Sequence, residues 1–113
     1  MADHIKIRPA SSTFVVRAGG AVIGESAHAL ELIEGDNPPV IYFPRSDIAM
    51  AFLEPSKTTS HCPYKGDATY FAIEAKSGTI ADAVWSYEDP KEDMAAIKGY
   101  LAFFHRKVAV EEV

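Results

Sequence analysis

The chain contains 113 residues with a net charge of −5; 48% of the residues are apolar and 24% are charged. These values predict a single folded domain over residues 1–113 and argue against disorder. They also argue against a nucleic-acid partner, and no apolar stretch approaches the ~20 residues that span a bilayer. The short apolar stretches give no reason to expect a membrane partner. The single cysteine excludes an internal disulfide, so we expect a cytoplasmic protein.

The first half of the chain predicts short strands separated by clear turn signals. Residues 13–17 and 21–26 flank a glycine pair and predict a hairpin. Residues 30–34 alternate weakly and end in a turn with two prolines, after which residues 40–43 form another short apolar strand.

The second half also predicts strands. In residues 70–75 apolar side chains alternate between two faces, and a turn at Ser77-Gly78 leads into a strand over residues 79–87. Residues 100–104 and 108–113 predict a closing hairpin. The chain is therefore expected to be mainly β, with strands of different lengths bent around one core.

Two short helices are predicted between these strands. Ser46 or Asp47 could cap the first, which Pro55 would end. Pro90 could open the second, and Gly99 would close it. Acidic residues follow Pro90, where they would stabilise a helix N-terminus rather than bind a metal.

The segment from His61 to Tyr70 contains more chemistry than a chain reversal requires. It holds the only cysteine, Cys62, together with two tyrosines and the dipeptide Lys65-Gly66. Cys62 could pack in the core, contact a ligand or act as a nucleophile, and its neighbour His61 would point to the opposite face of an extended segment. Lys65 could be solvated or could face a ligand that approaches the glycine backbone.

The segment from Tyr42 to Asp47 places an arginine just before a predicted helix. Arg45 could form an internal ion pair, or it could present its guanidinium to an anion beside free backbone amides. Farther along, Trp85 and Tyr87 share one face of a strand, where aromatic side chains either fill a core or line a pocket.

Together with residues 97–103, the segments Tyr42–Asp47, Thr59–Tyr70 and Trp85–Tyr87 form an ordered series that resembles the bacterial family known as domain of unknown function 427. The resemblance covers nearly the whole chain. It implies several short, strongly bent antiparallel sheets of the Mss4-like or β-tent kind. Some proteins of that topology bind zinc through paired cysteines, which this chain lacks. The family has carried a nucleotidyltransferase label, but the chain lacks the Gly-Ser and paired-aspartate pattern of those enzymes.

These observations predict a pocket for a small anionic or aromatic ligand, with no cofactor or metal. Arg45 and Lys65 would be its polar anchors. The expected site residues are Arg45, Ser46, Asp47, Cys62, Tyr64, Lys65, Gly66, Tyr70, Trp85 and Tyr87. Two alternatives stay open: an enzyme that uses Cys62 or transfers a nucleotidyl group, and a protein-interaction module. The strand at residues 108–113 could also be an edge that pairs with a second copy.

Overall fold

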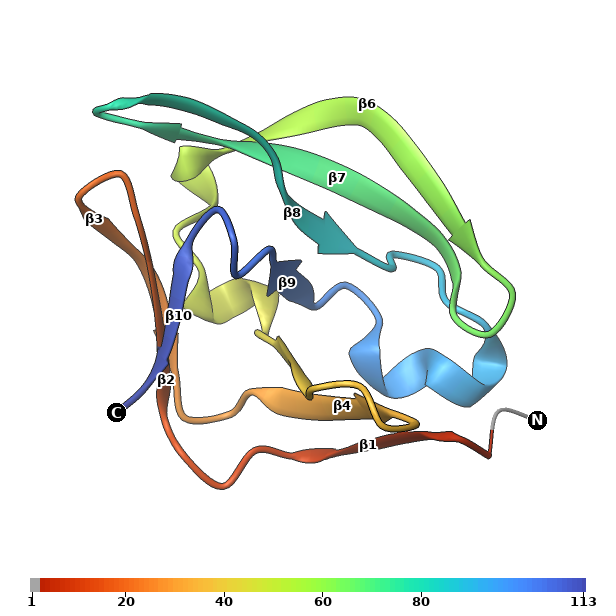
Figure 1. Cartoon of the computed structure of the whole chain (residues 1–113). Coiled ribbons are helices and arrows are strands. Elements are labelled where there is room, and N and C mark those ends of the chain that lie inside the picture. Colours follow the sequence, from red (N-terminus) through yellow and green to blue (C-terminus); the bar gives the residue numbers. More distant parts are fainter. Residues whose placement is uncertain (1–2) are drawn as a thin grey trace.

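Ten strands and three short helices make up the fold of residues 3–113, the part of the chain that the computed structural model describes (Figure 1). The strands are β1 (Ile5–Pro9), β2 (Phe14–Ala18), β3 (Ala21–Ser26), β4 (Leu30–Glu34), β5 (Val40–Tyr42), β6 (Leu53–Cys62), β7 (Gly66–Ala75), β8 (Gly78–Ser86), β9 (Leu101–Phe103) and β10 (Ala109–Glu112). The 3-10 helices are η1 (Arg45–Asp47), η2 (Met50–Phe52) and η3 (Glu92–Ile97). The predicted mainly β class is confirmed.

All strand pairs are antiparallel and form three sheets within this part of the chain, with orders β1-β4-β5, β10-β2-β3 and β6-β7-β8-β9. A bridge between Phe43 and Leu101 joins β5 to β9 and so links two of the sheets. Register shifts in β6 and β7 bend the long strands, as β-bulges do. In Figure 1 these strands arch over β9, while β1 and β4 lie on the other side.

The central strands separate two clusters of buried residues. Successive side chains of a strand point to opposite faces, so Phe43 and Val84 enter the first cluster while their neighbours Tyr42 and Trp85 enter or border the second. The sequence predicted one core. The structure has two packed regions, because this alternation directs side chains of the same strands into both. The second region contains the candidate site.

Most predicted strands are confirmed, but one pairing is wrong. Residues 100–104 and 108–113 do not form a hairpin, because β9 pairs with β8 and β10 pairs with β2. The link between them, which includes His105, instead carries the chain from one sheet to another. The strands β1 and β6 were not predicted, and Pro55 does not end a helix: η2 ends at Phe52, and Pro55 lies inside β6, near its register shift.

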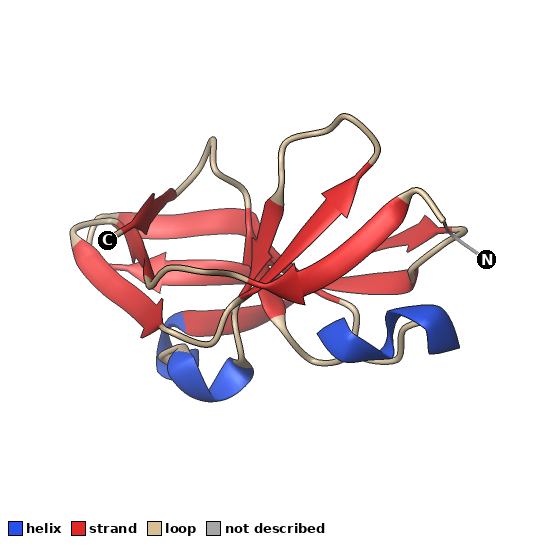
Figure 2. Cartoon of the chain, turned by 90° about the horizontal axis from the view of Figure 1, so that it is seen from below, coloured by secondary structure: helices blue, strands red, loops and turns tan. Residues whose placement is uncertain are grey.

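The predicted helices are single 3-10 turns or short runs of them (Figure 2). The first divides into η1 and η2, and η1 has no side-chain cap. Asp47 instead accepts a hydrogen bond from the hydroxyl of Ser26, at 2.6 Å. Among the described residues, no helix has the length and apolar character needed to cross a membrane.

Candidate functional site

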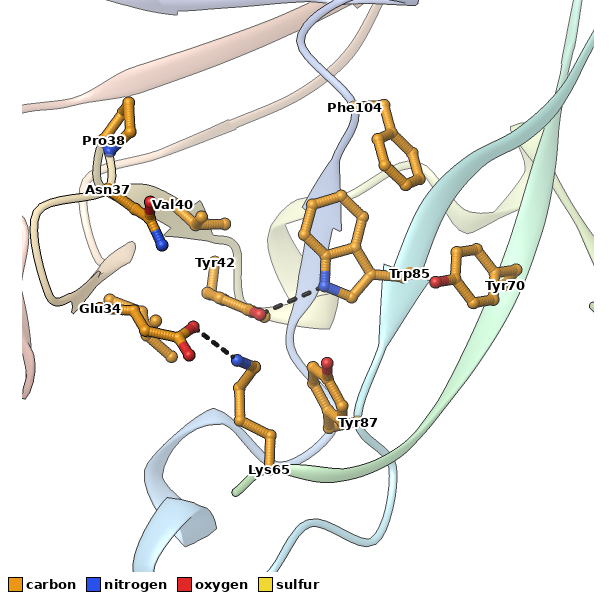
Figure 3. A pocket seen from close by; sticks show the side chains of 11 residues that line it. Glu34, Asn37, Pro38, Val40, Tyr42, Lys65, Tyr70, Trp85, Tyr87 and Phe104 are labelled. Atoms are coloured by element: carbon orange, nitrogen blue, oxygen red, sulfur yellow. Dashed lines mark hydrogen bonds and ion pairs between the residues drawn. The ribbon is translucent and has the colours of Figure 1, made fainter. Parts of the chain in front are cut away.

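A cavity of about 270 Å³ opens between the end of β4, the strand β5, and the aromatic side chains of β7 and β8 (Figure 3). It lies against the second cluster of buried residues. Its lining residues are Leu32, Glu34, Asn37, Pro38, Val40, Tyr42, Lys65, Tyr70, Trp85, Tyr87 and Phe104. The cavity is therefore mostly apolar and aromatic, with a charged group of each sign.

Lys65 forms the polar wall of this cavity together with Glu34. It stands in the turn between β6 and β7, and only 8% of its surface is exposed. Its ammonium donates to Glu34 Oε1 at 2.9 Å and lies 5.9 Å from the centre of the Tyr87 ring. The other carboxylate oxygen of Glu34 is 3.6 Å from His4. A buried ammonium is costly unless it is paired, so Glu34 explains how the fold tolerates Lys65 here.

Aromatic side chains that contact one another make the opposite wall. The indole N–H of Trp85 donates to the hydroxyl of Tyr42 at 3.2 Å, which fixes the orientation of both rings. The ring of Phe104 lies 4.6 Å from Trp85 and 6.3 Å from Tyr70, centre to centre. The hydroxyls of Tyr70 and Ser60 are hydrogen bonded at 2.8 Å. The wall is thus held in place before any ligand arrives.

Burial also sets the protonation of two phenols in this wall. It raises the pKa of Tyr42 to about 12, and it raises the pKa of Tyr87 as well. Both therefore stay neutral at physiological pH and act as hydrogen-bonding groups. The formal charges in the lining are those of Lys65 and Glu34.

Arg45, the other predicted anchor, is not part of this lining. Its guanidinium donates to the backbone oxygen of Gly99 at 3.1 Å and to Glu88 at 3.0 Å. It also lies 5.7 Å from the centre of the Phe71 ring. Arg45 therefore forms the internal ion pair that was one of its two predicted roles, outside the lining of this cavity.

Other predicted site residues also lie outside the lining. Ser46 is exposed, and Asp47 is used by its hydrogen bond to Ser26. Cys62 is half-buried and packs against the second cluster. Tyr64 is 45% exposed and stacks edge-on against His4.

Gly66 lies outside the lining and follows the turn between β6 and β7. Its φ of +109° lies in a region that favours glycine, whereas a Cβ there would meet the backbone nitrogen of Lys91 at 3.5 Å, an ordinary van der Waals distance. The same backbone N–H donates to the oxygen of Lys65 at 3.0 Å. The positive φ therefore explains the glycine, and the hydrogen bond from Lys91 joins the segment before η3 to the turn that presents Lys65.

Four predicted residues, Lys65, Tyr70, Trp85 and Tyr87, do lie together in the lining. Sequence reasoning missed Glu34 and Phe104, and it named Tyr42 only as part of a segment. The available signal for Glu34 was its place at the end of a strand just before the proline-rich turn, whose residues Asn37 and Pro38 also line the cavity. Among residues 3–113, no three histidine, cysteine or acidic side chains lie close enough to hold a metal ion.

In a comparison with protein families, the family model described as domain of unknown function (DUF427) matches residues 6–113, which is most of the chain. The chain belongs to the DUF427 family. No curated protein matches it. The DUF427 description gives no activity for this small, compact β domain.

Proposed function

We propose that the cavity binds a small ligand that has a flat, apolar body and one acidic group. The observation that carries this proposal is the side chain of Lys65, which is 11% exposed and places its ammonium in a cavity lined mainly by aromatic and apolar side chains. Apolar pockets with a few fixed polar groups are the usual form of small-molecule sites. The polar group orients the ligand, and the aromatic wall supplies the contact area.

The hydrogen-bonding capacity of the site supports an acidic group near Lys65. An ammonium has three donors, and Glu34 accepts one of them. Tyr42 accepts from Trp85, which leaves its own hydroxyl proton to donate. A ligand carboxylate beside Lys65 could therefore accept from the ammonium and from a neutral phenol. The rings of Trp85 and Tyr87 would contact the flat body of the ligand.

The proposal is tested by calorimetric titration with two probes, indoleacetate and para-hydroxyphenylacetate, and with their neutral methyl esters. We expect the acids to bind and the esters to bind more weakly. Lys65→Met should weaken the acids by about ten- to a hundredfold, because it removes a charged hydrogen bond from a partly desolvated site. The fluorescence of Trp85, the only tryptophan, gives an independent readout in the wall of the cavity.

Arg45→Met is the matched control, since it removes a cation that is also paired with a glutamate but lies outside the lining. It should leave the affinity for both acids within about twofold of the parent. Equal binding of the acids by the parent and by Lys65→Met would overturn the proposal. So would an equal loss in the two variants, which would mean that the acids respond only to the net charge of the protein.

A further inference from the structure

A second cavity, of about 300 Å³, lies directly beside the first. The two cavities share three lining residues, Pro38, Val40 and Trp85. The second cavity extends from this shared wall toward the sheet that contains β2 and β10. Its full lining is Phe14, Pro38, Pro39, Val40, Ile41, Trp85, Phe103, His105 and Val110.

The chemistry of the second cavity differs from that of the first. Eight of its nine lining residues are apolar or aromatic, and the remaining one is His105, which is exposed. It contains neither an ammonium nor a carboxylate, whereas the first cavity has Lys65 paired with Glu34. Going from one cavity to the other across Trp85, the lining therefore changes from charged and phenolic to hydrocarbon.

The residues of the shared wall present apolar atoms to both cavities. Pro38 is exposed and Val40 is half-buried, so both present apolar atoms at the surface between the cavities. Trp85 is held by its hydrogen bond to Tyr42 and by the adjacent ring of Phe104. A ligand passing over Val40 would contact a fixed indole on its way from one cavity to the other.

We infer that the two cavities form one elongated site and that its ligand is amphipathic, with an acidic aromatic head beside Lys65 and an apolar chain in the second cavity. This inference rests on the proposed function, which places the head. Volume supports it: ligand pockets usually hold ~300–1,000 Å³. At about 270 and 300 Å³ each cavity is at the lower limit, while the two together lie inside the range.

The inference is tested with a series of probes that share one head: para-ethylbenzoate, para-butylbenzoate and para-hexylbenzoate, titrated calorimetrically. Each methylene that leaves water for the second cavity should tighten binding by about two- to fourfold. The dependence on chain length, rather than any single affinity, is the quantity of interest. Lys65→Met should weaken all three probes by a similar factor and keep this dependence.

Val110→Phe should instead reduce the dependence of affinity on chain length and leave the affinity for the shortest probe unchanged. Val110 lines only the second cavity and is half-buried on the edge strand β10, where a phenylalanine side chain can be accommodated and would occupy the space of the ligand chain. This variant should bind para-ethylbenzoate like the parent and lose most of the gain from butyl to hexyl. Val22→Phe is its matched control, at an exposed valine of the same sheet that lines neither cavity.

The outcomes separate this inference from the proposed function. If para-ethylbenzoate binds in a Lys65-dependent way and the longer chains bind no tighter, the elongated site is overturned and the proposed function stands. If no probe binds, or if Lys65→Met changes none of the affinities, the proposed function is overturned together with the inference. An equal loss of chain-length dependence in Val110→Phe and Val22→Phe would assign the gain to general surface adsorption and overturn the elongated site.

Discussion

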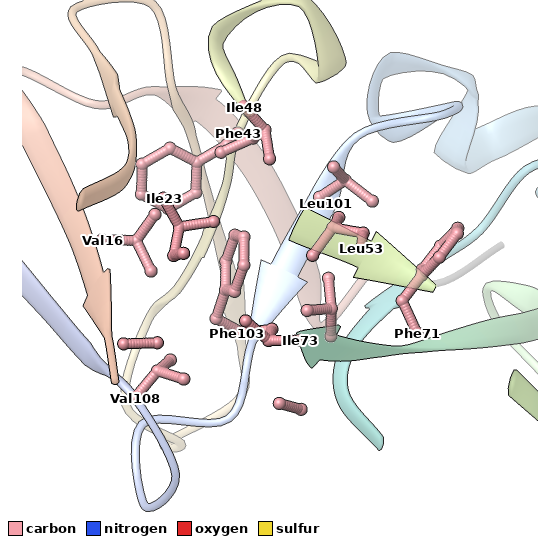
Figure 4. Packing of buried hydrophobic residues seen from close by; sticks show 13 residues of the cluster. Val16, Ile23, Phe43, Ile48, Leu53, Phe71, Ile73, Leu101, Phe103 and Val108 are labelled. Carbon is pink, nitrogen blue, oxygen red and sulfur yellow. The ribbon is translucent and has the colours of Figure 1, made fainter. Parts of the chain in front are cut away.

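The two clusters of buried residues are built from the same central strands but with different side chains. The first, shown in Figure 4, consists of aliphatic residues and phenylalanine and includes Phe43, which packs edge-to-face on Phe103 at 5.6 Å. The second includes Tyr42 and Tyr87 and borders the cavity that contains Lys65. Only the second cluster has side-chain polar groups, the tyrosine hydroxyls, that need hydrogen-bond partners.

This difference shows how one small domain places an apolar region and a partly polar region on the two sides of the same strands. Aliphatic side chains and phenylalanine fill space without needing hydrogen-bond partners, so the first cluster contains no polar side chain, and the cavity that its residue Phe103 lines has neither an ammonium nor a carboxylate. Phenols and an ammonium must keep partners or contact with solvent, and the cavity beside the second cluster accordingly contains the ion pair of Lys65 and Glu34. Alternation along β5, β8 and β9 lets the same backbone support both.

The sharpest way to test the comparison is a matched pair of leucine truncations. Leu101 is fully buried in the first cluster, whereas Leu32 is 2% exposed in the second and lines the cavity. Leu101→Ala should lower the free energy of unfolding by about 3–5 kcal/mol, because the space that it leaves is closed. Leu32→Ala should lower the free energy of unfolding by about 2–3 kcal/mol, because the space that it leaves merges with the cavity that Leu32 lines. Urea unfolding of both variants measures the difference, and a larger cost for Leu32→Ala would contradict it.

Local patterns predicted the strands well, because alternation and turn residues are properties of neighbouring positions. Residues 21–26 and 30–34 were predicted with the bounds that β3 and β4 have. The pairing of β10 was missed for a physical reason. Its partner β2 is distant in sequence, and the nearer β9 has its own partner in another sheet. Strand pairing is decided by tertiary packing, which one sequence does not display. The Mss4-like topology stays a prediction.

The candidate site was predicted in part for the same reason. The tyrosines, Trp85 and Lys65 come from segments whose unusual composition marked them. The role of Arg45 depended on Glu88, a partner 43 positions away that no local pattern could select. The role of Glu34 depended in the same way on Lys65, across 31 positions.

A second test compares the two ion pairs that these residues form. Lys65 and Glu34 have side chains that are 11% and 29% exposed, whereas Arg45 and Glu88 are 36% and 48% exposed. Glu34→Gln should lower the free energy of unfolding by about 1–3 kcal/mol, because a buried ammonium loses its charged partner. Glu88→Gln should lower the free energy of unfolding by about 1 kcal/mol or less, because exposed ion pairs contribute little to stability.

Chemical denaturation at pH 7 checks both values. Adding Lys65→Met to Glu34→Gln should recover most of the lost stability, since the double variant no longer buries an unpaired charge. Equal costs for the two glutamine variants would show that burial does not distinguish the pairs, and the contrast between the two regions would then rest on packing alone.

The smallest expected effect is the response of each cluster to alkaline pH. Burial raises the pKa of Tyr42 from about 10 to about 12, so between these values the unfolded chain loses this proton while the folded chain keeps it. The unfolded state then binds fewer protons, and stability falls as pH rises. The contribution of Tyr42 is complete below pH 10 and should fall by about 1 kcal/mol at pH 11.

Urea unfolding at several pH values from neutral to alkaline measures this loss. Tyr42→Phe should be less stable than the parent at neutral pH, because Trp85 loses its acceptor, but its stability should decline less steeply above pH 10. Leu101→Ala is the control from the first cluster, whose buried residues contain no titratable group. That variant should be less stable at every pH, with the alkaline slope of the parent. If Tyr42→Phe also keeps the parental slope, then burial of this phenol does not couple folding to pH, and the alkaline response of the second cluster has to come from Tyr87, whose pKa burial also raises.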